Sequence, residues 1–233
     1  MFFENPLLSG VLIKRYKRFF VDVRIKKQII TAHCPNTGSM LGLLKNGNKV
    51  WITKTNNTKR KLKYTLQIIE VDGKKIGVNT HLTNKIVFEA LNNSFFKQFK
   101  KGIKITREKT FGVDTRFDFL IENKKKKAFI EVKNVTLSRK PSLAEFPDSI
   151  TTRGAKHLNS LIDAASEGYD SYILYVIQRE DCNKFTIARD IDPQYYKLLT
   201  YAVKKNVKIL CYDCKFSTKR IKLNKFIKLK IDD

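Results

Sequence analysis

The spacing of hydrophobic and polar residues along the chain changes near residue 85. Before this point there are short runs with β-type alternation, separated by turns that contain Gly and Asn. Five or six short strands within about 80 residues are typical of a small closed barrel, and an OB-like β-barrel is the most economical prediction. The predicted strands cover residues 10–14, 19–26, 28–33, 49–53, 63–71 and 74–78.

After residue 85 helical and strand patterns alternate. A helix over 82–96 precedes three strands at 103–111, 117–121 and 128–137, which we expect to form a meander. The remaining predicted elements are a helix from 147 to 167, a strand at 171–178, a helix at 193–206, a strand at 207–211 and an edge strand at 220–231. The sequence therefore predicts two domains, an OB-like barrel over 1–85 and an α/β (α+β) domain of αβββαβ order over 86–233.

Three charged residues stand within the apolar strands of the meander. Asp118 lies in one strand, and Glu131 and Lys133 lie in the next. Alternate side chains of a strand share a face, so Glu131 and Lys133 point the same way while their neighbours enter the core. If Glu122–Lys127 turns the chain back, Asp118 comes alongside Glu131.

Two adjacent carboxylates form an all-oxygen site for a hard cation such as Mg²⁺ or Mn²⁺. A lysine beside that cation can position a water, and the combination suits phosphodiester hydrolysis. It is the pattern of the PD-(D/E)xK nuclease superfamily, here Asp118, Glu131 and Lys133. An acid-x-lysine pair could also be a solvated ion pair on a strand face. The apolar context favours a functional site, since acids in such strands need a partner.

The charge balance indicates a polyanionic partner. The chain has 47 Lys and Arg against 22 Asp and Glu, a formal net charge of +25 and a pI of about 9.9. Biased codon usage or solubility could account for part of this excess. Residues 1–85, however, contain only four acids, so we expect the barrel to be a cationic binding module. DNA is the first candidate, bound electrostatically and with little sequence preference.

Basic residues of the barrel are the candidates for DNA contacts. Guanidinium groups match phosphate oxygens in pairs, which favours the arginines. We predict that a strand-binding surface is formed by Arg15, Arg18, Arg60 and Lys61.

The sequence also bears on the compartment. No segment approaches 18 uncharged apolar residues, and the first residues lack the features of a secretory signal. Four scattered cysteines are too few for a disulfide scaffold. We therefore expect a cytoplasmic protein without a membrane segment, and the sequence leaves open whether it forms a homodimer.

Several motifs together resemble the sugar fermentation stimulation protein A (SfsA) family, from about residue 12 to residue 228. The resemblance implies an OB-like domain joined to a PD-(D/E)xK-type domain, DNA binding, and a role in regulating sugar-utilisation genes. It also implies that Asp118 and Glu131 are metal ligands, with Glu108 as a further acid on the preceding strand. The motifs are Arg15-Tyr-Lys-Arg-Phe19, Ala32-His-Cys-Pro-Asn-Thr-Gly38, Arg60-Lys61, Thr115-Arg-Phe-Asp-Phe-Leu120, Glu131-Val-Lys-Asn-Val-Thr-Leu137, Phe146-Pro-Asp-Ser-Ile-Thr-Thr-Arg-Gly-Ala-Lys-His-Leu158 and Gln178-Arg179.

The segment from 148 to 158 adds further candidates. On a helix Arg153 and His157 share one face, with Lys156 adjacent. We expect Arg153 and Lys156 to contact phosphates beside the metal. His157 is either a general acid or base or a structural residue. Gln178, at the end of a buried strand, either orients the lysine or a water or satisfies backbone groups.

Two functional classes follow. One is a metal-dependent nuclease that uses Asp118, Glu131 and Lys133. The other is a non-catalytic DNA-binding regulator that keeps the nuclease fold. The presence of all three motif residues favours the enzyme, and we find no helix-turn-helix pattern that would support a sequence-specific repressor. Whether the substrate is single-stranded DNA, duplex DNA or RNA stays open.

Overall fold

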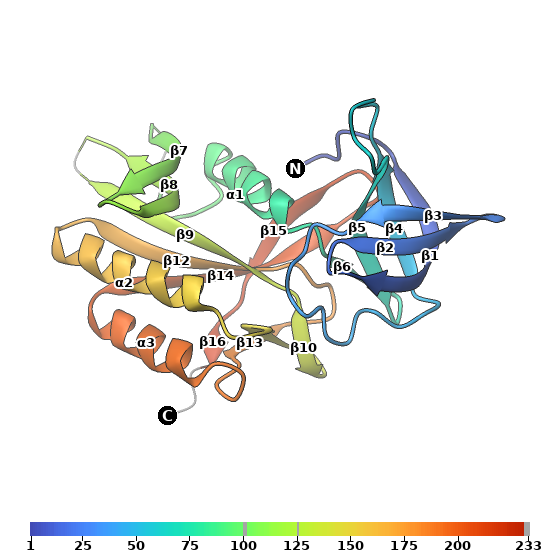
Figure 1. Cartoon of the computed structure of the whole chain (residues 1–233). Coiled ribbons are helices and arrows are strands. Elements are labelled where there is room, and N and C mark those ends of the chain that lie inside the picture. Colours follow the sequence, from blue (N-terminus) through green and yellow to red (C-terminus); the bar gives the residue numbers. More distant parts are fainter. Residues whose placement is uncertain (100–101, 125, 231–233) are drawn as a thin grey trace.

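Two lobes lie side by side in the computed structural model, which describes residues 1–99, 102–124 and 126–230 (Figure 1). The smaller lobe contains only strands, and the larger lobe is a mixed sheet with helices on both faces. The two lobes therefore correspond to the barrel and the α/β domain that the sequence predicts. None of the helices in the described part of the chain combines the length and hydrophobicity needed to cross a membrane.

The smaller lobe is a closed barrel, which confirms the predicted OB fold. Its alternating apolar positions point inward because successive side chains of a strand face opposite ways. The third strand pairs with both the second and the fifth, which closes the sheet. The strands are β1 Leu7–Tyr16, β2 Phe20–Ile25, β3 Gln28–His33, β4 Lys49–Lys54, β5 Tyr64–Val71 and β6 Lys74–Gly77.

The larger lobe is built on a six-stranded sheet of order β15-β14-β12-β9-β8-β7. The meander β7–β8–β9 is antiparallel, whereas β9, β12 and β14 run parallel, with β12 between the other two and almost entirely buried. The predicted meander is confirmed. Its strands are β7 Lys104–Phe111, β8 Thr115–Glu122, β9 Lys127–Val135, β12 Asp170–Ile177, β14 Val207–Phe216 and β15 Ile221–Phe226.

Helices cover both faces of this sheet, and the sheet separates two hydrophobic cores, one under the helices of each face. On one face α2 (Thr152–Ser166) and α3 (Pro193–Lys204) pack over β12 and β14. On the other face α1 (Thr83–Asn92) packs against β9 and β15, preceded by the short 3-10 turn η1 (Thr80–Leu82). The end of β9 thus lies where α1 and α2 approach the sheet from opposite sides (Figure 1).

A second, small sheet was not expected from the sequence. It has the order β10-β11-β13-β16, with strands β10 Leu137–Lys140, β11 Leu143–Phe146, β13 Lys184–Ile187 and β16 Leu229–Lys230. Strands of two to four residues are too short to show a period. The predicted edge strand over 220–231 is therefore wrong in part: β15 is an edge strand of the large sheet, but β16 pairs with β13, and residue 231 lies outside the described residues.

Two predicted helix boundaries also need correction. The helix expected from Pro147 begins at Thr152, because the Thr151 hydroxyl accepts the N–H of Gly154 and caps the helix there. The helix expected to reach 96 ends at Asn92, and Ser94 follows with a positive φ of 54°.

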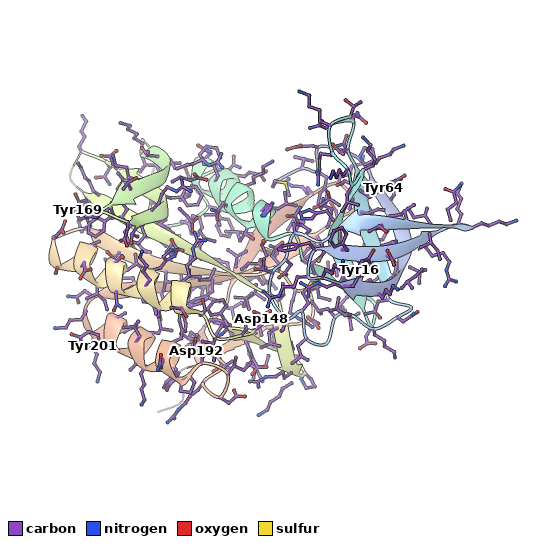
Figure 2. The ribbon with its side chains drawn as sticks, viewed as in Figure 1. Tyr16, Tyr64, Asp148, Tyr169, Asp192 and Tyr201 are labelled. Atoms are coloured by element: carbon purple, nitrogen blue, oxygen red, sulfur yellow. The ribbon has the colours of Figure 1, made fainter. Side chains whose placement is uncertain are left out.

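The lobes are joined by backbone and side-chain contacts. The N–H of Gly77 in β6 donates to the carbonyl of Gln178 at 2.9 Å. At another point of the boundary the Asp148 carboxylate accepts hydrogen bonds from Ser39 and Met40 of the barrel. Figure 2 shows Asp148 at the boundary between the lobes. All four cysteines are buried and free.

Candidate metal centre

Asp118 lies where two strands of the meander separate. β8 and β9 pair as far as Phe119 and Ile130, and Asp118 is the next position. Its carboxylate accepts the backbone N–H of Val132 at 2.7 Å and the side-chain amide of Asn84, in the first turn of α1, at 2.6 Å. These two donors fix the orientation of the carboxylate without using all its lone pairs.

Glu131 is the more deeply buried acid, with only 3% of its surface exposed. Its Oε1 accepts a hydrogen bond from Lys133 Nζ at 2.9 Å and contacts Nδ1 of His157. Among the described residues, its Oε2 is buried and has no hydrogen-bond partner. A buried carboxylate oxygen without a partner costs free energy, and a bound cation would supply the missing interaction. Glu131 and Asp118 therefore fit a hard divalent cation.

The two acids have opposite pKa shifts. Burial, followed by the negative charge of Glu131, raises the pKa of Asp118 to about 6, although hydrogen bonds from Val132 and Asn84 oppose this shift. Burial also acts to raise the pKa of Glu131, but the charges and hydrogen bonds of Lys133 and His157 outweigh it, so that this pKa is lowered. Glu131 is thus ionised at neutral pH, while Asp118 titrates near pH 6. Such a coupled acid pair is typical of functional sites.

An open cavity of about 490 Å³ contains both acids. The residues that line it come from η1 and the start of α1, from the three strands of the meander and from α2, so elements far apart in sequence meet here. Its charged or imidazole-bearing lining residues are His81, Arg107, Glu108, Asp118, Glu131, Lys133, Arg153 and His157.

Glu108 lines this cavity but does not join the acid pair. It lies opposite Asp118 on β7 with a positive φ of 51°, and its exposed carboxylate pairs with Arg116 at 3.3 Å. Within the described ranges, no three His, Cys, Asp or Glu side chains lie together as metal ligands. The expectation that Glu108 is a third ligand stays a prediction.

Helix α2 brings two of its three predicted residues to the cavity. His157 is buried beside Glu131, and Nε of Arg153 donates to His157 Nε2 at 3.5 Å. With Nε2 as an acceptor, His157 Nδ1 carries the proton that faces Glu131. Lys156 points elsewhere and pairs with Asp114 at 2.6 Å.

Gln178 belongs to the joint between the lobes. Its amide donates to Asn134 at 2.5 Å and to Thr83 at 3.1 Å, and a side chain at Gly77 would collide with it. Lys133 is not among its hydrogen-bond partners in the described residues, so the expected contact with the lysine is not formed. Gln178 reaches the site indirectly, through Asn134 and Thr83, which both line the cavity.

The four basic residues of the barrel have different surroundings. Arg15 donates to the carbonyls of Asn36 at 2.6 Å and Gly38 at 3.0 Å, so its guanidinium holds the 34–40 loop. Arg18 and Lys61 are exposed, and Arg60 lines a separate cavity between the lobes. The prediction that these residues bind DNA stays a prediction, with Arg15 the least available of the four.

Sequence reasoning missed Asn84 and the position of Asp148. Asn84 shows no pattern in the sequence, because it meets Asp118 only after α1 has packed on the sheet. Asp148 was expected at the start of a helix, but it instead accepts hydrogen bonds from the barrel loop. The Phe146–Leu158 motif offered a signal for Asp148. A motif of this length covers more residues than one face of a helix, which indicates that the segment before the helix also has a role.

Fold and site together define a class: an OB barrel joined to a restriction-endonuclease-like domain with an acid, acid and lysine at the end of its meander. The model of the sugar fermentation stimulation protein RE domain matches residues 81–220, and that of the SfsA N-terminal OB domain matches residues 13–78. This chain belongs to the sugar fermentation stimulation protein family, which confirms the resemblance inferred from its motifs.

Relatives match over nearly their full length. The sugar fermentation stimulation protein homolog of Pelagibacter ubique is 53% identical over 98% of this chain and 99% of its own. The homolog of Brucella anthropi is 41% identical over 97% and 99%. A solved structure of Pyrococcus furiosus SfsA, in complex with Ca²⁺, superposes with a TM-score of 0.89 at 28% identity and covers 99% of this chain and 98% of that one.

Proposed function

We propose that this protein is a metal-dependent nuclease that hydrolyses phosphodiester bonds in DNA. The observation that carries the proposal is the buried Oε2 of Glu131, which has no hydrogen-bond partner in the described part of the chain. It lies in a cavity that also contains Asp118 and the lysine of the motif. The Ca²⁺ complex of the Pyrococcus furiosus relative supports a hard divalent cation in this fold.

Asp118 and Glu131 would hold Mg²⁺ or Mn²⁺. When bound, such an ion offsets phosphate charge and lowers the pKa of a coordinated water. Lys133 donates a hydrogen bond to Glu131 and its Nζ also lies 3.2 Å from His157 Nδ1, which leaves at least one N–H of its ammonium for a water or a phosphate oxygen. Asn84 and the N–H of Val132 keep Asp118 in place, and His157 does the same for Glu131.

Arg153 supports a phosphate-bearing substrate. Its side chain is exposed, lines the metal cavity and lies on the same helix face as His157. A guanidinium presents several donors in a plane and matches phosphate oxygens well. Together with the net charge of +25, this favours a polyanion that is bound mainly through its backbone.

Labelled DNA, incubated with and without Mg²⁺ or Mn²⁺, tests the proposal. We expect cleavage only with metal, and its loss in Glu131→Gln and Lys133→Ala. DNA binding without metal-dependent cleavage, together with no Mn²⁺ binding in calorimetry, would favour the non-catalytic regulator of sugar-utilisation genes instead.

A further inference from the structure

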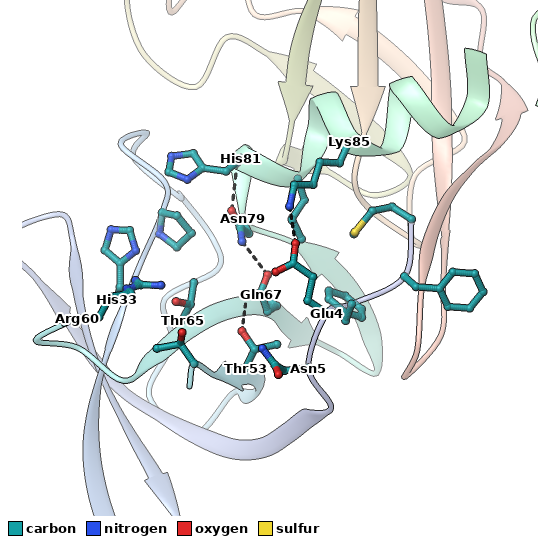
Figure 3. Close-up of a pocket in the computed structure, with 16 residues that line it drawn as sticks. Glu4, Asn5, His33, Thr53, Arg60, Thr65, Gln67, Asn79, His81 and Lys85 are labelled. Carbon is teal, nitrogen blue, oxygen red and sulfur yellow. Dashed lines mark hydrogen bonds and ion pairs between the residues drawn. The ribbon is translucent and has the colours of Figure 1, made fainter. Parts of the chain in front are cut away.

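A second cavity lies between the barrel and the start of α1 (Figure 3). It measures about 390 Å³, at the small end of the range for ligand sites. Strands β3, β4 and β5 form its barrel wall, and the first five residues of the chain and the η1 turn close it from the other lobe. No residue of this cavity belongs to the acid pair of the metal centre.

The barrel residues that line the cavity are mostly polar, and the cavity is cationic. His33, Arg60 and His81 lie close enough that Arg60 and His81 both act on the pKa of His33. Glu4 is the single acid among the lining residues, and Lys85 neutralises it at 2.7 Å. Arg60 has no acidic partner among the described residues. An anion is therefore the expected occupant of the side where these three residues gather.

An aromatic pair, formed by exposed Phe19 and half-buried His33, extends this cavity over the barrel surface. The ring of Phe19 lies 6.4 Å from that of His33 with an interplanar angle of 18°, and 44% of Phe19 is exposed. The pKa of His33 is lowered, by burial first and then by Arg60 and His81, so its ring is neutral at neutral pH. Flat, neutral rings beside a cation suit stacking with unpaired bases.

The cavity adjoins the metal centre at His81. His81 lines both cavities, and its neighbours Thr83 and Asn84 line the one with the acids. A strand bound along this surface, from Phe19 and His33 past His81, is directed toward the cavity that contains Asp118. Amide and hydroxyl groups along this path, such as those of Thr53 and Gln67, can hydrogen-bond to a base edge.

We infer that this cavity and the Phe19–His33 pair bind unpaired nucleotides of the strand that leads to the metal centre, so that the substrate is a nucleic acid with a single-stranded segment. The inference rests on the proposed nuclease function, because it gives the substrate class of the same site. A double helix presents its bases in pairs, and neither the stacking surface nor a cavity of this size accommodates it.

Fluorescence anisotropy tests this without cleavage, in EDTA, with a short labelled oligothymidylate and a blunt-ended, two-stranded duplex of equal charge. We expect the single strand to bind at least about fivefold more tightly than the duplex, as stacking of a few bases requires. Phe19→Leu and Arg60→Ala should each weaken single-strand binding by about fivefold or more and leave duplex binding within about twofold.

Lys59→Ala is the matched control for Arg60→Ala, because it removes one charge from the adjacent exposed position and does not line the cavity. It should change both affinities by less than about twofold. Equal affinity for strand and duplex, or equal losses in Lys59→Ala and Arg60→Ala, would overturn the inference.

Two further measurements separate the alternatives. If thymidine monophosphate binds as tightly as the oligonucleotide and is lost in Arg60→Ala, the cavity holds a free nucleotide and the inference is wrong. Failure of the nuclease proposal would be recognised separately, as absent Mn²⁺ binding. Thermal unfolding of each variant verifies that its fold is retained.

Discussion

Two buried glutamates of the larger lobe differ in one decisive respect. Glu131 on β9 and Glu145 on β11 are 3% and 5% exposed. Each pairs with a nearby basic residue, Glu131 with Lys133 and Glu145 with Arg139. Both oxygens of Glu145 accept hydrogen bonds from Arg139, at 2.7 Å and 2.9 Å. Arg139 also pairs with Asp190 at 2.8 Å, so this network is complete.

The hydrogen bonding of the Glu131 carboxylate is incomplete. One oxygen serves both Lys133 and His157, while the other is buried without a partner in the described structure. A complete ion-pair network leaves no oxygen for a ligand, whereas an incomplete one in an open cavity has capacity left for a ligand. Burial of an acid therefore does not identify a site, but the state of its second oxygen does.

The largest expected effect is a difference in Mn²⁺ affinity between variants of these two glutamates. Glu131→Gln should lower Mn²⁺ affinity by at least about 100-fold, because a ligand charge is lost. Glu145→Gln should leave Mn²⁺ affinity unchanged and destabilise the protein by about 3 kcal/mol, since Arg139 loses a buried partner. Calorimetric titration and denaturant unfolding measure the two effects. Equal loss of metal binding in both variants would contradict the assignment of Glu131 as a metal ligand and of Glu145 as a structural residue.

Lys133→Ala tests the division of labour around Glu131. We expect Mn²⁺ affinity within about threefold of the wild type but cleavage slowed by at least about 100-fold, because the lysine acts on water or phosphate and not as a ligand. Plasmid nicking measures the cleavage. Lys104→Ala, an exposed lysine paired with Glu122, is the charge control and should cleave normally. Full activity in Lys133→Ala would rule out its assigned role.

The pH dependence of metal binding follows from Asp118. Its pKa is raised from 3.8 to about 6, so the folded protein holds this proton more strongly than the unfolded chain does. Mn²⁺ must displace the proton, and affinity should therefore be constant above pH 7 and fall about tenfold per unit below pH 6.

The metal-free protein should show the opposite trend. Its stability decreases as pH rises from about 4 to about 6, because ionising Asp118 in the folded state is unfavourable. Asp118→Asn should flatten this decrease, and the Asn84 amide can turn to accept a hydrogen bond from the new side chain. A metal affinity that is level between pH 5 and pH 8 would contradict the assignment of Asp118 as a ligand.

The smallest expected effects compare two arginines of the barrel. Arg15→Ala should destabilise the barrel by about 1 to 2 kcal/mol, because the carbonyls of Asn36 and Gly38 lose their donor. Arg18→Ala should leave stability unchanged and weaken DNA binding about twofold to threefold, with a salt slope reduced by about one unit. If Arg15→Ala loses DNA affinity but no stability, Arg15 contacts DNA directly.

The sequence was informative where the pattern is local. Strand alternation and the acid-x-lysine spacing predicted the barrel, the meander and the face shared by Glu131 and Lys133. Hydrogen bonds between distant elements were not predictable, because nothing near Asn84 or Asp148 indicates which partner it meets. The small sheet also escaped prediction, since its strands owe their form to pairing and not to a period of their own.

An Mn²⁺-soaked crystal tests the central claim most directly, because Mn²⁺ is located by its anomalous scattering. We predict an anomalous peak within coordination distance of Glu131 Oε2 and the Asp118 carboxylate, and its absence in crystals of Glu131→Gln. A peak that persists in Glu131→Gln, or one that appears in the wild type only at surface acids such as Asp114, would contradict the metal centre.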